Sequence, residues 1–320
     1  MIIGIPKEIK IHEYRVALTP SGVETLVGLE HQVIIQSKAG DAIGFSDQDY
    51  QAAGAKIANS AEATFEQAEM IIKVKEPQPN ECKMLSNNQV LFTYLHLAAD
   101  PTQAELLLAS GATCIAYETI TDDDSRLPLL QPMSEIAGRM SIQSGAHHLE
   151  KTQGGSGVLL SGATGVYPAQ VLVIGGGVVG INATKVALGM GAQVTILNRS
   201  ISKRLVDFQQ QYGSQLSIEL SNKTNIEKKL ETADLVIGAA LVAGASAPKL
   251  ITRDMLKFMK KGSVLVDVSI DQGGCFETSK VTTHDKPTYV VDGIIHYCVG
   301  NMPGAVGQTS PLALTNATLP

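Results

Sequence analysis

The chain has 320 residues, 44% of them hydrophobic, and a net charge of −6. This length favours two domains over one. The acidic balance, the absence of Trp and an aromatic content of 4% argue against a nucleic-acid or membrane-surface partner. The four cysteines lack C-x-x-C spacing, which argues against a zinc site, and a disulfide framework would be unusual in a chain of this length. With no signal-peptide layout and no apolar stretch near the ~18–20 residues of a membrane span, we expect a cytoplasmic protein without a metal.

The first part of the chain alternates short apolar runs with helical segments. The pattern predicts strands at 2–5, 33–36, 70–74, 90–94 and 114–117, and helices at 21–29, 47–53 and 102–110. Such a series is typical of βαβ units with a parallel sheet. A polar turn at 122–126 is a candidate domain edge.

A long helix is predicted over 134–153, with Ser134 as its N-cap and Gly154-Gly155 as its stop, and it could join two domains. A second series of strands follows at 171–174, 194–197, 235–237, 264–268 and 289–291. Together the patterns predict an α/β protein with two doubly wound parallel sheets. A helix is expected to start at 312–319 without a C-terminal cap, which suggests a chain that continues beyond residue 320.

The most specific motif is Gly175-Gly-Gly177-Val-Val-Gly180, which follows the apolar run 171–174. In a G-x-G-x-x-G motif the first glycine permits a tight turn, the second admits a pyrophosphate, and the third lets the helix pack closely. The helix N-terminus then offers free N–H groups to the phosphates. The strand, the helix and a second strand ending at the polar Asn198 all favour a Rossmann dinucleotide site. The alternative is a glycine-rich turn in an ordinary βα unit.

Three charged or titratable residues stand where predicted strands of the first half end. Arg15 follows the first strand, Lys75 ends the 70–74 strand and His96 follows the 90–94 strand. A guanidinium can clamp a carboxylate, a lysine can hold an oxygen, and a histidine can move a proton near neutral pH. Each has a plainer interpretation: a surface ion pair for Arg15, a solvated strand end for Lys75, and a satisfied core residue for His96. Their shared edge makes the set more suggestive than any member.

In the second half, the 264–268 strand leads into a glycine-rich loop that carries Asp271. This acid would lie near the nicotinamide end of a bound cofactor, where it could accept a proton or orient water. An Asx turn that holds the loop is the alternative. Asn301 and Met302 offer an amide and a thioether further along. The remaining histidines show no metal spacing, and the adjacent His147 and His148 are expected to be structural or solvated.

The sequence resembles the alanine dehydrogenase/transhydrogenase alpha-subunit family from end to end, with its specific features on the dehydrogenase side. The segments that carry this resemblance are Gly4-Ile-Pro-Lys-Glu, Arg15-Val-Ala-Leu-Thr-Pro, Lys73-Val-Lys-Glu-Pro, Phe92-Thr-Tyr-Leu-His-Leu-Ala-Ala, Pro132-Met-Ser-Glu-Ile-Ala-Gly-Arg, Asp267-Val-Ser-Ile-Asp-Gln-Gly-Gly-Cys-Phe-Glu and Asn301-Met-Pro-Gly-Ala-Val. The resemblance implies interconversion of L-alanine with pyruvate and ammonia, a step of amino-acid catabolism, with NAD. It also implies a homohexamer. The expected domains are 1–128 plus 305–320 for the substrate and 129–304, a Rossmann domain, for NAD(H).

Matched by motif position, the resemblance implies roles for individual residues. His96, Asp271 and Lys75 would be catalytic. The substrate-binding residues would be Arg15, Lys75, Tyr94, Met133 and Asn301. The cofactor-binding residues would be Ser134, Gly175, Gly177, Val178, Val179, Gly180, Asn198, Arg199, Lys203, Ala240, Leu241, Val268, Ile270, Asp271, Asn301 and Met302.

The chain departs from the family pattern at two places. The family usually has Asp at the end of the second cofactor strand, and this chain has Asn198 followed by Arg199, so NADP could also be accepted. The family also continues past the point where this sequence ends. Two other functions stay open: a transhydrogenase-type subunit with a membrane partner, and a non-catalytic nucleotide-binding relative.

Overall fold

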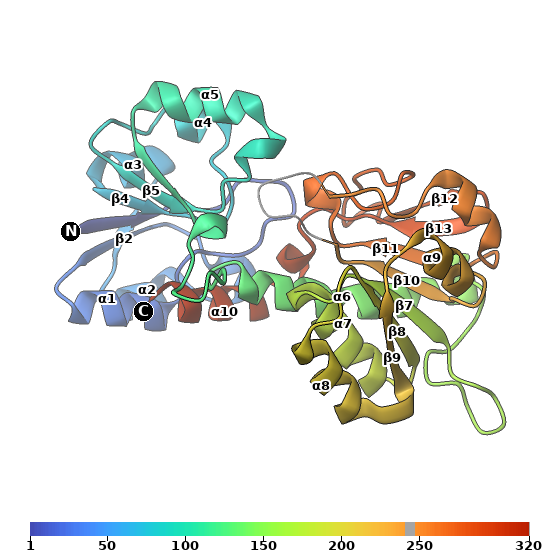
Figure 1. Ribbon diagram of the computed structural model, residues 1–320. Helices are drawn as coiled ribbons and strands as arrows, with labels where there is room; N and C mark the ends of the chain where they lie inside the picture. The colour runs from blue at the N-terminus through green and yellow to red at the C-terminus, as the bar shows by residue number, and fades with distance from the viewer. Residues whose placement is uncertain (241–246, 320) are drawn as a thin grey trace. The chain divides into compact units, whose positions relative to one another are not determined.

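The computed structural model describes residues 1–240 and 247–319 and divides into two compact units. The first unit comprises Met1–Met133 with Pro303–Pro320, and the second comprises Ser134–Met302. Each unit is an α/β sheet structure, as the sequence predicts (Figure 1). In the described ranges no helix is both long and apolar enough to cross a membrane.

The first unit is built on a six-stranded parallel sheet in the order β3-β2-β1-β4-β5-β6. Its strands are β1 (Ile2–Ile5), β2 (Gln32–Gln36), β3 (Lys56–Ala58), β4 (Met70–Ile72), β5 (Val90–Thr93) and β6 (Thr113–Ala116). Its α-helices are α1 (Pro20–Gly28), α2 (Asp47–Ala52), α3 (Ala61–Gln67), α4 (Pro79–Cys82), α5 (Pro101–Ser110) and α10 (Thr309–Thr318). The sequence patterns missed β3, α3 and α4, which are short, and the predicted 70–74 strand ends two residues early.

The strand order reverses between β1 and β4, and this reversal distributes the helices. Right-handed crossovers place α1 and α2 on one face and α3, α4 and α5 on the other. Side chains of these last three helices pack with β4 and β5 in one core that includes Phe65, Cys82, Leu91 and Leu107. Figure 1 shows α1 and α10 together on the opposite face. A polar crevice is therefore expected at the carboxyl ends of β1 and β4, where the order switches.

The second unit has a seven-stranded sheet in the order β12-β13-β11-β10-β7-β8-β9. Its strands are β7 (Gln170–Ile174), β8 (Gln193–Asn198), β9 (Leu216–Leu220), β10 (Leu235–Gly238), β11 (Val264–Asp267), β12 (Thr288–Val291) and β13 (Ile294–Tyr297), and its helices include α6 (Gln131–His148), α7 (Val178–Gly189), α8 (Lys203–Tyr212) and α9 (Lys223–Leu230). The sheet is not wholly parallel, because β12 and β13 form an antiparallel hairpin at the edge. The patterns missed β9 and β13.

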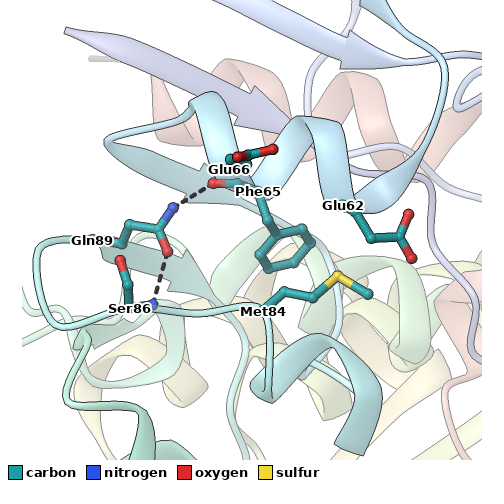
Figure 2. A pocket seen from close by; sticks show the side chains of 6 residues that line it. All are labelled: Glu62, Phe65, Glu66, Met84, Ser86 and Gln89. Atoms are coloured by element: carbon teal, nitrogen blue, oxygen red, sulfur yellow. Dashed lines mark hydrogen bonds between the residues drawn. The ribbon is translucent and has the colours of Figure 1, made fainter.

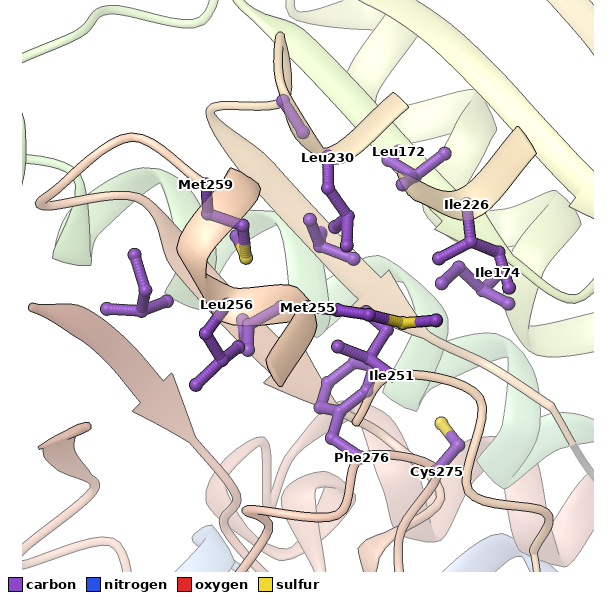
Figure 3. Packing of buried hydrophobic residues seen from close by; sticks show 14 of the residues in the cluster. Leu172, Ile174, Ile226, Leu230, Ile251, Met255, Leu256, Met259, Cys275 and Phe276 are labelled. Carbon is purple, nitrogen blue, oxygen red and sulfur yellow. The ribbon is translucent and has the colours of Figure 1, made fainter. Parts of the chain in front are cut away.

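One face of this second sheet is covered by α9 and by the 3-10 helix η6 (Arg253–Phe258). Figure 3 shows Ile226 and Leu230 of α9 and Met255 of η6 packed against strand residues Leu172 and Ile174. The crossovers from β7 to β8 and from β8 to β9 place α7 and α8 on the other face. The order therefore switches between β7 and β10, so the glycine motif after β7 stands at the switch point.

The predicted start of the long helix was wrong. Helix α6 begins at Gln131, so Ser134 lies inside it and is not its N-cap. Pro132 explains the earlier start, because proline is favoured in the first turn, where its missing N–H costs nothing. The helix ends at His148 and not at 153, since the chain turns there and a short 3-10 helix follows, with Gly154 at φ +88°.

Candidate functional site

In the first unit the three predicted substrate-site residues follow neighbouring strands, at the carboxyl ends of these strands. Arg15, Lys75 and His96 follow β1, β4 and β5, which are neighbours in the sheet, at their carboxyl ends. Arg15 is 2% exposed and Lys75 is 6% exposed, so neither is the surface ion pair or solvated strand end of the plainer interpretations. His96 is only half-buried and is not a core residue.

Arg15 is held by Glu13, two residues earlier. Its Nε donates to Glu13 Oε1 at 2.7 Å and its NH2 group to Glu13 Oε2 at 2.5 Å, and its backbone N–H also donates to Oε1 at 3.0 Å. Burial disfavours the charged guanidinium, but the hydrogen bonds and charge of Glu13 outweigh it and raise the pKa of Arg15. The NH1 group donates to the Met133 sulfur at 3.2 Å. The predicted substrate residues Arg15 and Met133 are therefore in contact.

Lys75 stands next to a buried ionic cluster. The ammonium of Lys73, which is fully buried, lies 3.0 Å from Glu8 Oε2 and 2.8 Å from Glu81 Oε1. The other oxygen of Glu8 accepts the backbone N–H of Val74 at 2.6 Å and that of Lys75 at 3.3 Å. Burial raises the pKa of Glu8, and the charge of Lys73 lowers it in part. The cluster therefore fixes the backbone from which the Lys75 side chain projects.

His96 has a left-handed backbone, with φ at +50°, which is uncommon for a residue that is not glycine. The carboxylate of Glu118, in the 3-10 helix after β6, accepts the N–H of His96 at 2.6 Å and that of Leu95 at 3.1 Å. The His96 ring stacks on Tyr94, with centroids 5.9 Å apart and an interplanar angle of 10°. The Tyr94 hydroxyl donates to the Leu129 carbonyl at 2.5 Å. The predicted site residues Tyr94 and His96 are therefore in contact.

The carboxylates that hold the backbone at these strand ends are not among the residues predicted from the sequence. Glu13, Glu8 and Glu118 each accept the backbone N–H of one predicted substrate residue. Only proximity in sequence signalled any of them: Glu13 precedes Arg15 by two residues, whereas Glu8 and Glu118 lie far away in the chain. Their pairing depends on which strands are neighbours, which only the sheet order decides.

In the second unit, the three motif glycines meet the steric requirements of a nucleotide-binding turn. Gly175 has φ at +114°, and a Cβ there would lie 2.4 Å from the Ala239 carbonyl oxygen. At Gly180 a Cβ would lie 1.8 Å from the Gly175 carbonyl oxygen, whereas at Gly177 it would stand in open space. Gly177 is the N-cap of α7, and because glycine has no side chain it does not cap the first N–H groups of the helix. The turn therefore leaves space and helix N-terminal donors for an anionic group, as a pyrophosphate requires.

Asn198 ends β8 and contacts this turn through both ends of its amide. The N–H of Gly176 donates to Asn198 Oδ1 at 2.9 Å, and Asn198 Nδ2 donates to the Ser200 carbonyl at 2.7 Å. Arg199 and Lys203 are exposed, and Lys203 is the first residue of α8. The structure thus brings Asn198 to the glycine motif and leaves the two cations at the surface.

Asp271 is exposed and lies in the 3-10 helix η7 (Ile270–Gln272) beyond β11. Its Oδ2 accepts the backbone N–H of Asn301 at 3.3 Å, so these two predicted residues also meet. The hydroxyl of Ser269, in the same loop, donates to the carbonyl of Ala240 at 2.8 Å. This bond joins the ends of β10 and β11 at the carboxyl edge of the sheet.

Five other predicted cofactor residues have simpler environments. Val178 and Val179 form the first turn of α7, and Val268 donates its N–H to the Gly238 carbonyl at 2.9 Å. Ile270 and Met302 are buried, at 4% and 3% exposed. Leu241 lies outside the described residues.

A surface pocket of about 420 Å³ opens elsewhere in the first unit. Figure 2 shows its lining of Glu62, Phe65, Glu66, Met84, Ser86 and Gln89. The Gln89 amide donates to the Phe65 carbonyl at 2.5 Å and accepts the Ser86 N–H at 2.9 Å. Gln89 precedes β5, so the pocket lies at the amino end of that strand, whereas ligands of such sheets bind at the carboxyl ends. It contains none of the predicted site residues.

Within the described residues no group of three or more His, Cys, Asp or Glu side chains could hold a metal ion. The four cysteines are free thiols. Burial raises the pKa of the Cys82 thiol to about 11, which makes it unreactive near neutral pH.

Two doubly wound sheets and a glycine turn at the second switch point define a two-domain α/β protein of the dinucleotide-binding type. The family model "Alanine dehydrogenase/PNT, N-terminal domain" matches residues 4–137, and "Alanine dehydrogenase/PNT, C-terminal domain" matches residues 141–320. The chain belongs to the alanine dehydrogenase/PNT family.

Named relatives are similar over the whole chain. It is 61% identical to an alanine dehydrogenase of Halomonas elongata and 49% identical to one of Mycobacterium tuberculosis, and it covers 86% of each. Identity to the Bacillus subtilis alanine dehydrogenase is 52%, with 84% of that protein covered. Among solved structures, an L-alanine dehydrogenase matches with a TM-score of 0.94 and 51% identity, over 100% of this chain and 88% of that one. A transhydrogenase from Sinorhizobium meliloti, 24% identical, shares the fold with a TM-score of 0.84, over 100% of this chain and 92% of that one.

Proposed function

We propose that this protein interconverts L-alanine with pyruvate and ammonia by using a nicotinamide nucleotide. The observation that carries the proposal is the edge of the first unit, where Arg15, Lys75 and His96 follow neighbouring strands and each has its backbone N–H bound by a carboxylate. The identity of 49–61% to proteins named alanine dehydrogenase supports the same reaction.

The roles of the substrate residues follow from their chemistry. Arg15 pairs with the substrate carboxylate, and Glu13 fixes the plane of its guanidinium. Lys75 holds a carbonyl or carboxylate oxygen of the substrate and offsets the negative charge that develops on it. His96 transfers a proton as water adds to the imine and as ammonia leaves. Holding the substrate in one orientation lowers the barrier further, because the reacting atoms no longer have to find each other.

The residues of the second unit fit a nicotinamide nucleotide. Gly175, Gly177 and the N-terminus of α7 would hold the pyrophosphate, and Asn198 would face the adenosine ribose. When bound, the nucleotide supplies the acceptor for the hydride of the substrate α-carbon. Asp271 is the second proton-transfer group, and the Asn301 N–H that it accepts orients its carboxylate.

NAD is the expected nucleotide, and NADP is accepted because Asn198 carries no negative charge and Arg199 follows it. The homohexamer implied by the resemblance stays a prediction, which light scattering would test.

The test is an absorbance assay at the reduced-nicotinamide band with purified protein. L-Alanine should drive reduction of NAD, and pyruvate with ammonium should drive oxidation of NADH, whereas D-alanine should do neither. Arg15→Ala should abolish both reactions, and Arg253→Ala, which removes an exposed arginine paired with Asp292, should leave them intact. Hydride transfer between two nucleotides without alanine would instead support a transhydrogenase-type subunit, and binding without turnover would support a non-catalytic relative.

A further inference from the structure

The carboxylate of Asp267 is the centre of the loop that carries Asp271. Asp267 is the last residue of β11 and is fully buried. Its Oδ1 accepts the N–H of Ser269 at 3.1 Å, and its Oδ2 accepts that of Cys275 at 2.9 Å. Asp271 lies between these two points in the chain. One carboxylate therefore closes both ends of the segment on which Asp271 stands.

Further donors converge on the same group. Oδ2 also accepts the Phe276 N–H at 3.3 Å and the Ser279 hydroxyl at 2.5 Å, and the Cys275 thiol lies 3.4 Å from Oδ1. Gly274 has φ at +75°, and a Cβ there would lie 2.6 Å from Oδ2, so the backbone wraps tightly around the carboxylate. Burial raises the pKa of Asp267, and these hydrogen bonds lower it in part.

We propose that Asp267 is a positioning residue for the reaction, which sets where the Asp271 carboxylate stands at the edge of the sheet. This inference rests on the proposed function, because it needs Asp271 to move a proton. The same hydrogen bonds orient Ser269, whose hydroxyl holds the Ala240 carbonyl. A displacement of the loop would therefore be transmitted to the end of β10 as well.

The test variant is Asp267→Asn, which keeps the volume of the side chain. Its amide presents an acceptor on one side only, so its NH2 group must face backbone donors on the other, and the loop loosens. We expect kcat to fall by about 10–100-fold, the scale of a misplacement near 1 Å. Asp234→Asn is the matched control: Asp234 is also buried, accepts the Gln170 N–H at 2.9 Å and directly precedes β10, at the amino ends of the strands of the same sheet. It should lower Tm and leave kcat unchanged.

A double-mutant comparison separates positioning from general stability. In the Asp271→Asn background, Asp267→Asn should change kcat by less than about threefold, because the group that it positions is gone. An undiminished loss in that background, or an equal loss of kcat in Asp234→Asn, would overturn the inference. Should Asp267→Asn fail to fold, Ser279→Ala removes one donor and should give a smaller loss with the same dependence on Asp271.

The outcomes also separate this inference from the proposed function. Normal turnover in Asp271→Asn alone would remove the proposed role of Asp271, and the inference with it. A strong loss in Asp271→Asn with normal turnover in Asp267→Asn would overturn the inference and leave the proposed function intact.

Discussion

The side chain of Asn198 holds the glycine turn of the second unit, because the Gly176 N–H donates to its Oδ1 at 2.9 Å. The other end of the same amide donates to the Ser200 carbonyl at 2.7 Å. An aspartate could accept the first bond but could not donate the second. Asparagine at position 198 therefore has two effects: it leaves the end of β8 without a negative charge, and it ties the glycine turn to the residues after β8.

Asn198→Asp should shift the preference toward NAD by ~1–3 kcal/mol, the scale of one charged contact. The new charge repels a 2′-phosphate, and the lost bond to Ser200 frees the chain that carries Arg199. The measurement is kcat/KM for NAD and NADP in both proteins. Arg199→Ala should weaken NADP alone. If the wild type does not use NADP and Asn198→Asp leaves the ratio of kcat/KM for NAD and NADP unchanged, Asn198 is only a ribose ligand.

His96→Ala and Asp271→Ala should each lower turnover by ~10²–10⁴-fold, as the loss of a positioned acid or base does. Nucleotide binding should persist in both, which fluorescence titration with NADH would measure. His147→Ala is the control for His96, because His147 is exposed and is not among the predicted site residues. Near-normal rates in both site variants would contradict the assignment.

Lys75→Ala should lower kcat/KM for pyruvate and leave the affinity for NADH nearly unchanged. The reason is that Lys75 belongs to the first unit, beside the strand ends where Arg15 also lies, whereas the glycine turn belongs to the second unit. Lys56→Ala, which removes an exposed lysine of β3, should change neither value. If Lys75→Ala changed only the affinity for NADH, the assignment of Lys75 to the substrate site would be contradicted.

Three glycines near α7 should respond to alanine in three different ways. Gly180→Ala has no room and should destabilise the fold by about 1–3 kcal/mol or more. Gly177→Ala meets open space, so Tm should hold while affinity for the nucleotide falls. Gly189→Ala, also in open space near the end of the helix, should stabilise by about 0.5–1 kcal/mol without affecting binding. Thermal melts and NADH titrations of the three variants provide the check, and equal effects would contradict it.

His296 should make the fold sensitive to acid. It is fully buried, with Nδ1 at 3.0 Å from the Ile294 carbonyl oxygen and Nε2 at 2.7 Å from the Thr278 hydroxyl. Burial lowers its pKa below the ordinary value of 6.5. Above pH 6.5 the histidine is neutral in both the folded and the unfolded state, so its full contribution to stability is present. Below it only the unfolded chain takes up the proton at first, so stability falls until the folded pKa is passed.

The test compares Tm between about pH 7 and about pH 5, the range in which histidine titrates. His296→Gln should lose less Tm over this range than the wild type, whatever its Tm at neutral pH. His147→Gln, at an exposed position, should not reduce the acid sensitivity. Equal slopes in wild type and His296→Gln would contradict the prediction.

The sequence by itself determined the fold class, most strands and the glycine turn. Buried parallel strands need continuous apolar runs such as 171–174, and Gly175 and Gly180 stand where no side chain fits, so both signals are local and visible in the chain. The short elements β3, α3 and α4 escaped because a few residues carry too little periodicity. The start of α6 was misplaced because Pro132 at the second position competed with a nearby serine as the helix-start signal.

Only the tertiary structure decided which groups hold the predicted site residues in place. Glu8 reaches Lys75 because β1 and β4 are neighbours, and Glu118 reaches His96 because β5 and β6 are. These pairs are 67 and 22 residues apart in the chain, and no local pattern records them. A buried N–H must find an acceptor wherever the fold provides one, and strand order determines which carboxylate that is.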